Sequence, residues 1–461
     1  MKKITKLWIG TLAFILLFYH EDTGLNTAII GLLAWFLLFK KPIKDENKRE
    51  FWFLSVCVFI SAFSFAWYGD AFSFFALFTS VIVLGFQSQY PKINILLYPF
   101  LWLLNYAGFI FRFFSFKHWL PKRIAGNDFF KKFLALVAIP LFFVLIFIIV
   151  YASGSDMFYA FFQDIPFNFN FFQIMVLGCL GFFLFFNLLF VGIPKPFIRL
   201  NTQLSPNFSM NKQINLKPTF SFLDMDFERK SGEISIILLN ILLAFFIITY
   251  VYEQFFSMAK NGTISDEIHQ RVAALIFSII MAIGVITFYF KSGFNFDRKA
   301  GLLKKLSYVW IILNALLIVS AFIKNAEYVS VLGLTFKRIG VFIFLFLSLA
   351  GLFITYLKLR FSKTNSFLLN RMLRIFFITF ILSSCINFSW IVTKYNIAFQ
   401  KDDDSGYLKS LEFNKQILYK AYKDDPQWKS YFENEKEFIE RQNSKGILSR
   451  HFYFQSIKLE E

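Results

Sequence analysis

The residues of this sequence that could carry out chemistry are carboxylates and histidines next to the ends of long apolar stretches. Asp70, Asp156 and Glu327 could act as acids or bases in a transferase for a lipid-linked substrate. The segments 20–22 and 266–269 combine oxygen and imidazole groups, but neither has a spacing typical of a metal site. We therefore predict no catalytic residue, no metal site and no cofactor, and we expect these carboxylates to lie in solvated loops.

The positions of these residues depend on apolar stretches that cross a membrane. At 57% apolar and 17% charged residues, the chain cannot cover a water-soluble surface, because ordinary domains are about 25% charged. Eleven stretches are long enough, with their flanks, to cross a hydrocarbon core of about 30 Å. They are residues 7–19, 25–39, 51–68, 71–86, 133–151, 171–193, 234–252, 272–290, 306–323, 341–356 and 375–392. The predicted fold class is an all-α polytopic integral membrane protein with about 11 transmembrane helices.

One further stretch, residues 93–111, is predicted not to cross. Pro91 and Pro99 interrupt it, Asn105 lies in its middle, and an aromatic and basic segment follows, so we expect a re-entrant or interfacial helix over 93–119. The loops on one side of the membrane then hold 31 Lys and Arg residues and those on the other hold five. Basic loops mark the cytoplasmic side, so the N-terminus is predicted inside and the C-terminus outside. The alternative of twelve spans reverses the later loops.

This topology divides the chain into four parts. Residues 1–193 form a first membrane bundle of six spans, 194–233 a cytoplasmic loop, 234–392 a second bundle of five spans, and 393–461 an extracytoplasmic tail. The basic loops are expected to contact a lipid bilayer with anionic headgroups. Nucleic acid is not an expected partner, because the basic residues lie between spans and not on one compact face.

The span interiors contain no charge in this topology, which argues against a proton-coupled transporter. Their asparagines are expected to hydrogen-bond one helix to another. Lys337 and Arg338 are exceptions on the extracytoplasmic side. The Arg338 guanidinium is expected to bind a carboxylate, with Glu327 and Asp70 as candidates, or a headgroup phosphate. The alternative is an exposed loop charge.

The tail changes in composition and becomes amphipathic. Apolar positions near 411–422 fit one helix, and a second helix is predicted with Asp425 as its N-cap and Pro426 as its first residue. The residues expected on the packed face of the second helix are Trp428, Tyr431, Phe432, Glu435, Phe438 and Ile439. So small a tail buries little surface alone, so we expect it to dock on the membrane surface or on a membrane or envelope protein partner.

Several short segments together resemble an uncharacterised family of bacterial inner-membrane proteins, the DUF4153/DUF4173 group. They are Gly24-Leu25-Asn26, Tyr68-Gly69-Asp70, Ala-Ser-Gly-Ser at 152–155, Glu327-Tyr328, Gly333-Leu334-Thr335 with Arg338, and Lys394-Tyr395-Asn396-Ile397. The chain departs from the family pattern at Leu332, where a tyrosine is usual. The resemblance implies a multi-pass protein of the bacterial cytoplasmic (inner) membrane and supplies no reaction. The candidate functional residues on the extracytoplasmic face are Asn26, Asp70, Asp156, Glu327, Thr335, Arg338 and Asn396.

Three functions remain open. The leading hypothesis is a structural, sensory or accessory subunit of an envelope system, without catalysis, whose tail engages a partner. The second is a transporter or flippase for an apolar or amphipathic molecule, which would need a central cavity and helix breaks near Pro140, Gly178, Gly181 or Gly284. The third is a membrane transferase that uses the extracytoplasmic carboxylates.

Overall fold

The computed structural model describes residues 1–39, 45–120, 136, 139–155, 157–158, 170–210, 224–255, 264–291, 293–401 and 405–457. All regular secondary structure in these residues is helical, which confirms the all-α fold class. In this part of the chain, seven helices are long and apolar enough to cross a membrane. They are α3 (Asp45–Tyr68), α4 (Ala71–Gln89), α12 (Phe171–Leu189), α15 (Met225–Phe255), α17 (Gly301–Leu332), α18 (Phe336–Arg360) and α19 (Asn365–Ser384). The chain is therefore a multi-pass membrane protein.

The count of eleven spans stays a prediction. The stretches expected as spans one, two and five form α1 (Lys3–Phe18), α2 (Leu25–Leu38) and α10 (Ile139–Gly154), with 16, 14 and 16 residues. These helices are shorter than the roughly 20 residues that a straight crossing needs. The eighth stretch lies in α16 (Ile264–Tyr289), which has 26 residues.

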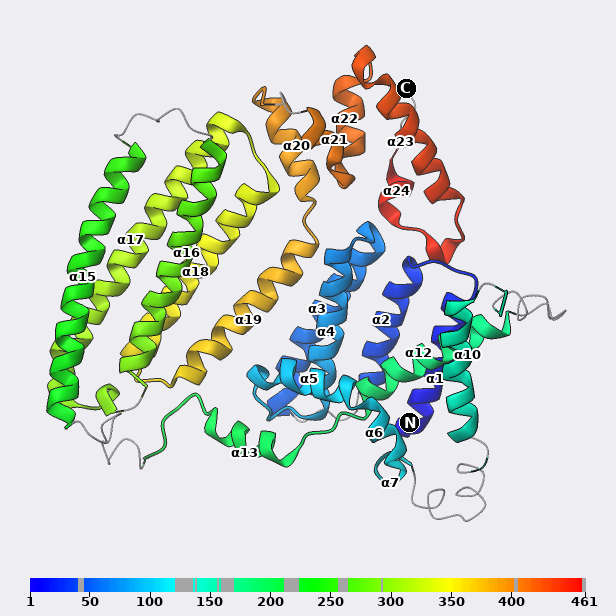
Figure 1. Cartoon of the computed structure of the whole chain (residues 1–461), viewed down its shortest axis with the longest axis horizontal. Helices are drawn as coiled ribbons and strands as arrows, with labels where there is room; N and C mark the ends of the chain where they lie inside the picture. The colour runs from blue at the N-terminus through cyan, green and yellow to red at the C-terminus, as the bar shows by residue number, and fades with distance from the viewer. Residues whose placement is uncertain are drawn as a thin grey trace.

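The helices form two bundles joined by α19 (Figure 1). The first bundle packs α1 to α4 and α12 around a core that includes Leu7, Val58 and Phe186. The second packs α15 to α18 around a core that includes Ile286 and Leu317. Helix α19 contacts α18 of the second bundle and α3 and α4 of the first, so it is the membrane-spanning link between them.

The surface of the second bundle shows why it needs lipid. Leu238, Leu242 and Phe245 follow one face of α15 and are 61%, 63% and 65% exposed. A lipid-facing helix can leave such side chains uncovered, because its solvent is as apolar as they are. On the packed side, the Asn240 side chain donates a hydrogen bond to the Leu306 carbonyl at 3.1 Å, which joins α15 to α17 as predicted for the span asparagines.

Residues 93–119 form no continuous helix of spanning length. They fold as η1 (Ile95–Leu97), α5 (Tyr98–Ala107), α6 (Phe109–Phe114) and α7 (Phe116–Trp119), with a break at Gly108. Arg112 fastens this segment to the C-terminal end of α12. Its guanidinium donates to the Asn187 side chain at 2.8 Å and to the Phe190 carbonyl. Its cation also stabilises the carbonyl end of the α12 dipole.

The last predicted span, residues 375–392, is divided between two helices. α19 ends at Ser384, and α20 (Phe388–Ala398) begins after a break at 385–387 that the Asn387 side chain caps. Asn387 accepts a hydrogen bond from the Trp390 N–H at 2.8 Å and donates to the Phe413 carbonyl at 2.9 Å. Because these bonds favour a new helix start, α20 packs with the tail instead of continuing α19.

The tail is a small helical unit. It consists of α21 (Ser405–Ser410), η5 (Glu412–Asn414), α22 (Lys415–Tyr422), α23 (Pro426–Ser444), η6 (Ile447–Ser449) and α24 (Phe452–Ser456). Asp425 caps α23 by accepting a hydrogen bond from the Gln427 N–H at 2.9 Å, and Pro426 is the first helical residue, which confirms the prediction. Trp428, Phe432 and Ile439 are buried as predicted, and Tyr431 and Glu435 are half-buried. The prediction is wrong for Phe438, which is exposed and packs against the Phe454 ring at the edge of the helix. The tail docks on the ends of the protein's own helices, and we call this end of the molecule the tail side.

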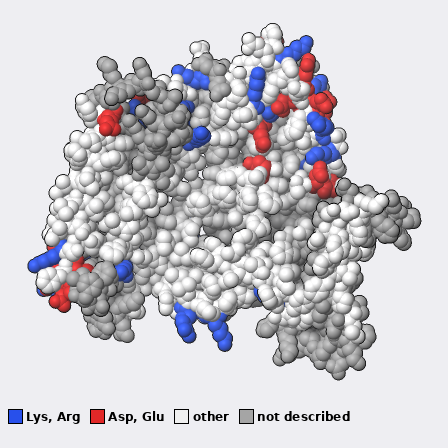
Figure 2. All heavy atoms as spheres, in the orientation of Figure 1, with Lys and Arg blue, Asp and Glu red and all other residues white. Residues whose placement is uncertain are grey.

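The charges are distributed differently on the two ends. Figure 2 shows both signs along the upper right edge, where Figure 1 places α23, and basic residues at the lower edge near α13 (Lys195–Gln203). Lys358 was predicted to belong to a basic loop over residues 358–374. Lys358 lies in the last turn of α18, is fully buried, and donates to the Phe290 carbonyl at the C-terminal end of α16 at 2.9 Å. The expectation of a loop charge is therefore wrong here, because α18 extends beyond its apolar stretch.

Candidate functional site

The turn between α1 and α2 is held by Asn26, whose side chain is fully buried. Its carboxamide oxygen accepts two backbone hydrogen bonds and its nitrogen donates two, which uses the four positions that an amide offers. The partners are the N–H groups of Gly24 (2.9 Å) and Thr27 (2.8 Å) and the carbonyls of Leu17 (3.1 Å) and Asp22 (2.7 Å). Asn26 is therefore a structural residue of this turn.

The tail binds directly to the same turn. The Leu25 N–H donates to the Arg450 carbonyl at 3.2 Å, and the Asp22 N–H donates to the Ser449 hydroxyl at 2.8 Å. The approach is close, because a Cβ added at Gly24 would lie 2.4 Å from the Ser449 backbone. Lys445 adds an ion pair with Asp22 at 3.2 Å, which solvent screens.

The turn between α3 and α4 is the second contact. Gly69 has a φ of +70°, and a Cβ there would lie 2.1 Å from the His451 ring. His451 also packs edge-on against Phe65, with ring centroids 5.7 Å apart. Asp70 caps α4, because its carboxylate accepts from the Ser73 N–H at 3.0 Å and from the Ser73 hydroxyl. Burial lowers the pKa of His451, more than the Asp70 charge raises it.

The turn between α17 and α18 is the third. Gly333 has a φ of +79°, and a Cβ there would lie 2.7 Å from the Asn396 side chain. Asn396, in α20, is buried and binds both backbone groups of Leu334, accepting from its N–H at 2.7 Å and donating to its carbonyl at 2.9 Å. Thr335 is the N-cap of α18 and accepts from the Arg338 N–H at 3.4 Å.

Arg338 does not bind a carboxylate in this turn. Its guanidinium donates to the carbonyls of Leu332, at 3.0 Å, and Gly333. Glu327 instead pairs with Lys324 at 3.0 Å within α17. The predicted partners Glu327 and Asp70 are therefore wrong, because the unpaired carbonyls at the end of α17 lie closer and need a cation.

The predicted site residues that the structure describes thus lie on the tail side, but they do not converge on a reacting centre. Asn26, Asp70, Thr335, Arg338 and Asn396 build three turns, and each turn is closed by a residue that follows α19. Asp156 lies outside the described residues. Within the described residues, no three His, Cys, Asp or Glu side chains come close enough to hold a metal ion.

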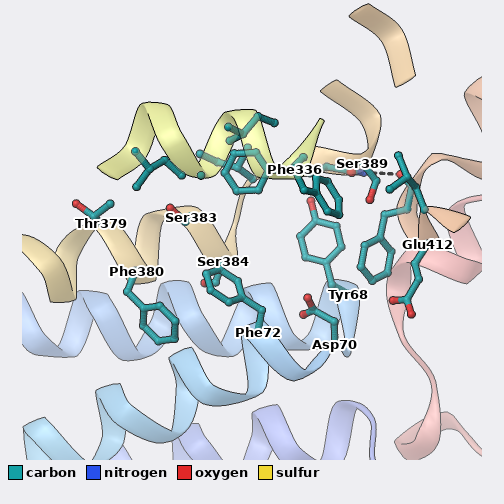
Figure 3. Close-up of a pocket in the computed structure, with 18 of the residues that line it drawn as sticks. Tyr68, Asp70, Phe72, Phe336, Thr379, Phe380, Ser383, Ser384, Ser389 and Glu412 are labelled. Atoms are coloured by element: carbon teal, nitrogen blue, oxygen red, sulfur yellow. Dashed lines mark hydrogen bonds between the residues drawn. The ribbon is translucent and has the colours of Figure 1, made fainter. Parts of the chain in front are cut away.

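A cavity of about 610 Å³ lies on the tail side between the two bundles (Figure 3). Its apolar wall comes from α4, α18 and α19, and includes Phe72, Phe336, Ile343, Leu347, Phe376 and Phe380. The tail closes one end with Leu411, Glu412 and Phe413. The size falls within the range of ordinary ligand sites, roughly 300–1,000 Å³.

The polar groups of the cavity are unevenly placed. Figure 3 shows Asp70, Tyr68 and Glu412 at one end and Thr379 and Phe380 at the other, with Ser383 and Ser384 between them. Among the lining residues that the structure describes there is no Lys or Arg. Within the same described residues, the Glu412 carboxylate has no ion pair and the Tyr68 hydroxyl has no hydrogen bond. The cavity therefore offers acceptors and negative charge at its tail end.

The sequence alone indicated only some of the polar residues that line this cavity. Asp70 was a candidate from its position at a span end, and Tyr68 stands beside it in the family segment. Glu412 carried no signal, because it is one of many charged residues in an amphipathic tail. Only docking of the tail brings it to the same cavity as Asp70.

Comparison with known proteins gives one match. A family described as Domain of unknown function (DUF4153) matches residues 50–418, which is most of the chain. No curated protein and no solved structure matches the sequence. The matched range includes two of the three turns and ends within α22, before the segment 445–451 that contacts the first bundle.

Proposed function

Because the chain belongs to the DUF4153 family, whose description assigns no activity, we propose a function from the geometry of its tail side. We propose that it is a membrane-embedded structural, sensory or accessory subunit of an envelope system, without catalysis, which presents its tail to a protein partner. The proposal places the protein in the bacterial inner membrane with the N-terminus in the cytoplasm and the tail outside. The asymmetry of basic residues between the predicted loops supports this orientation.

One observation carries the proposal. Three side chains of the family segments, those of Asn26, Asp70 and Asn396, form hydrogen bonds that build the three turns on which the tail docks. A catalytic centre would instead leave several such groups free and facing one space. The hydrogen bonds of these three side chains therefore shape the turns that hold the tail in a defined position on both bundles.

The docked tail has a surface suited to a partner. α23 buries Trp428, Phe432 and Ile439 on one face and leaves the other exposed. The exposed face carries both signs of charge. Its acidic residues include Glu433, Glu437 and Glu440, and its basic residues include Lys429 and Lys436. Charged surfaces of this kind direct the choice of partner and the rate of association more than they add affinity.

The test is a crosslinking and co-purification experiment in intact cells with a surface variant. Substitution of Glu433, Glu437 and Glu440 by Lys reverses the charge of the exposed face and leaves the buried face unchanged. We expect the unmodified protein to recover a membrane or envelope protein in stoichiometric amount and the triple variant to lose most of it. Deletion of the tail would be a poorer test, because it also removes the contacts of Ser449 and Arg450 with the first bundle.

A matched control removes charge from the opposite end. Lys195→Gln with Arg199→Gln in α13 changes exposed residues far from the tail in the fold and should leave recovery unchanged. Recovery of the unmodified protein alone, at normal abundance, would contradict the accessory role. Equal loss in both variants would also contradict it, because the effect would not depend on the tail.

The cavity favours a second candidate, a transporter or flippase for an amphipathic molecule. The predicted helix breaks do not support it in the described residues, because α12 continues through Gly178 and Gly181, α16 continues through Gly284, and Pro140 is the second residue of α10. Reconstitution in liposomes with a fluorescent lipid would test this activity. An impermeant quencher reaches only the outer leaflet. If it removes only the fluorescence of that leaflet, the protein has not moved the lipid across the membrane and the flippase function is contradicted.

A further inference from the structure

We propose that the tail-side cavity binds an amphiphile from the membrane that carries an apolar chain and a cationic amine head. The chain lies along α18 and α19, and the amine lies at Asp70 and Glu412. This inference goes beyond the partner-binding role proposed above and does not depend on it.

The apolar wall extends to membrane depth. Phe336 begins α18 and Leu347 is eleven residues later, so the wall covers about 16 Å along the helix axis. Phe376 and Phe380 stand one turn apart on α19 on the facing wall. Both helices are long and apolar enough to span the membrane. A ligand that fills this space therefore needs an apolar chain, and the surrounding bilayer is its natural source.

The charge at the tail end selects the head. Asp70 and Glu412 both line the cavity, and Asp70 uses one carboxylate oxygen to cap α4. No basic residue lines the cavity in the described part of the chain to neutralise them. An amine that binds there gains charge-assisted hydrogen bonds, whereas a phosphate or carboxylate head is repelled.

Aromatic rings add to this preference. The Tyr68 and Phe413 rings lie 4.9 Å apart, centroid to centroid, and both line the cavity beside the carboxylates. Ring faces attract a cation within about 6 Å. The Tyr68 hydroxyl is also available as an acceptor for an ammonium group. The end of the cavity thus combines two carboxylates, two rings and a hydroxyl, a set that favours a cation over a neutral or anionic head.

The experiment compares three probes with one chain and different heads. The full-length protein is placed in nanodiscs of phosphatidylcholine, and the affinities of oleylamine, oleyl alcohol and oleyl phosphate are measured by native mass spectrometry at pH 7. We expect oleylamine to bind about tenfold more tightly than oleyl alcohol and oleyl phosphate to bind least. The double variant Asp70→Asn with Glu412→Gln should lose the preference for the amine and keep the affinity for the alcohol. Asn is as good an N-cap as Asp, so α4 keeps its cap.

A second variant fills the space. Gly340 lines the cavity, and a Cβ added there meets no atom within 4 Å, so Gly340→Leu should project into the cavity without a clash and weaken all three probes at least about fivefold. Gly284→Leu is the matched control, because Gly284 also has no neighbour within 4 Å and is not among the lining residues. Glu437→Gln with Glu440→Gln controls for net charge.

Each result decides one part of the inference. Equal affinity for the amine and the phosphate, or an amine preference that survives in the double variant, would overturn the assignment of the head. Unchanged binding in Gly340→Leu would overturn the assignment to this cavity. Loss of the preference in the charge control would show a general effect of net charge and would also overturn it. If Gly340→Leu loses the probes but still recovers the protein partner, ligand binding in the cavity and partner binding by the tail are independent of each other.

Discussion

Asn396 shows how a single side chain on the tail side stabilises the fold. It satisfies the N–H and the carbonyl of Leu334, next to Gly333, where the backbone has just left α17. Buried backbone groups of this kind are costly when they lose their partner. Asn26 does the same between α1 and α2. These two residues therefore stabilise the turns between helices by providing hydrogen-bond partners for buried backbone groups.

Asn396→Ala should destabilise the protein by about 1–3 kcal/mol, because the mutation leaves two buried backbone groups of Leu334 without a partner. The measurement is the thermal unfolding midpoint of the purified protein in detergent. Asn434→Ala, at an exposed position of α23, is the control and should change the midpoint little. A midpoint for Asn396→Ala equal to that of the control would show that this contact contributes nothing.

Gly69→Ala should release the tail from the first bundle. The positive φ costs an alanine about 1 kcal/mol, and the new methyl group would overlap the His451 ring. Faster trypsin cleavage between 441 and 450 would report the release. Adding His451→Ala should reverse the part of the increase in cleavage rate that comes from overlap with the ring. The part that comes from the positive φ should remain. Gly301→Ala, which has ordinary φ and no neighbour within 4 Å, should cleave at the original rate.

At the level of elements, the tail contacts both bundles and so connects them. Its α21 and α22 pack with α17, α18 and α20 around Leu334, Val392 and Leu418. Its last segment contacts the α1–α2 and α3–α4 turns through Ser449, Arg450 and His451. The tail is too small to fold stably around its own core, so these contacts provide the additional burial it needs.

Docking of the last tail segment should weaken in acid. Burial lowers the pKa of His451 in the folded protein below its unfolded value of about 6.5, although Asp70 opposes the shift. The unfolded or undocked segment therefore binds more protons, and the stability present above pH 6.5 is lost as the pH falls toward the folded pKa. Trypsin itself slows in acid, so cleavage at 441–450 is divided by cleavage of an unfolded reference peptide at the same pH. This ratio should be higher at pH 5.5 than at pH 7.5.

The matched variant for this effect is His451→Asn, which keeps a polar side chain without a titrating group in this range. The acid-dependent part of the cleavage should disappear in this variant. An identical pH response in both proteins would assign the effect to other groups.

The whole molecule consists of two bundles that share α19 and the tail, with a cavity where the four parts meet. α19 ends at Ser384, short of the tail side reached by α20, and this leaves a space that α18 and the tail border. Because α19 and the tail contact both bundles and also border the cavity, a ligand bound in the cavity would contact the parts that join the bundles.

The proposed orientation predicts the outcome of cysteine labelling in intact cells. In a background without the exposed Cys179, Glu437→Cys in α23 should react with a membrane-impermeant maleimide. Arg199→Cys in α13 should react only after the membrane is made permeable. The reverse pattern would contradict the assignment of the basic loops to the cytoplasm, and labelling of both sites would contradict their placement on opposite sides.

Local patterns were enough to predict the class of the protein and some of its turns. Apolar runs require helices in lipid, because every backbone group must be bonded within its own segment, and this was read correctly from composition and length. The Asp425 cap follows from a few neighbouring residues and is confirmed, and the buried face of α23 is confirmed for Trp428, Phe432 and Ile439. Within the stretch 93–111, Pro99 lies in the first turn of α5 as its sequence suggests, whereas the break at Gly108 was not predicted. Each of these features depends on interactions over a few residues of sequence.

Contacts between distant segments were decided only by the tertiary structure. Arg338 binds the carbonyls of its own turn and not a carboxylate, and Lys358 is buried against the end of α16. Asn387 starts a new helix partly because Phe413, 26 residues later, accepts its hydrogen bond. Asp70 and Glu412 line one cavity because the tail folds back on both bundles. Side-chain periodicity gives the face of a helix but not its neighbour, so the cavity could not be inferred before the packing was known.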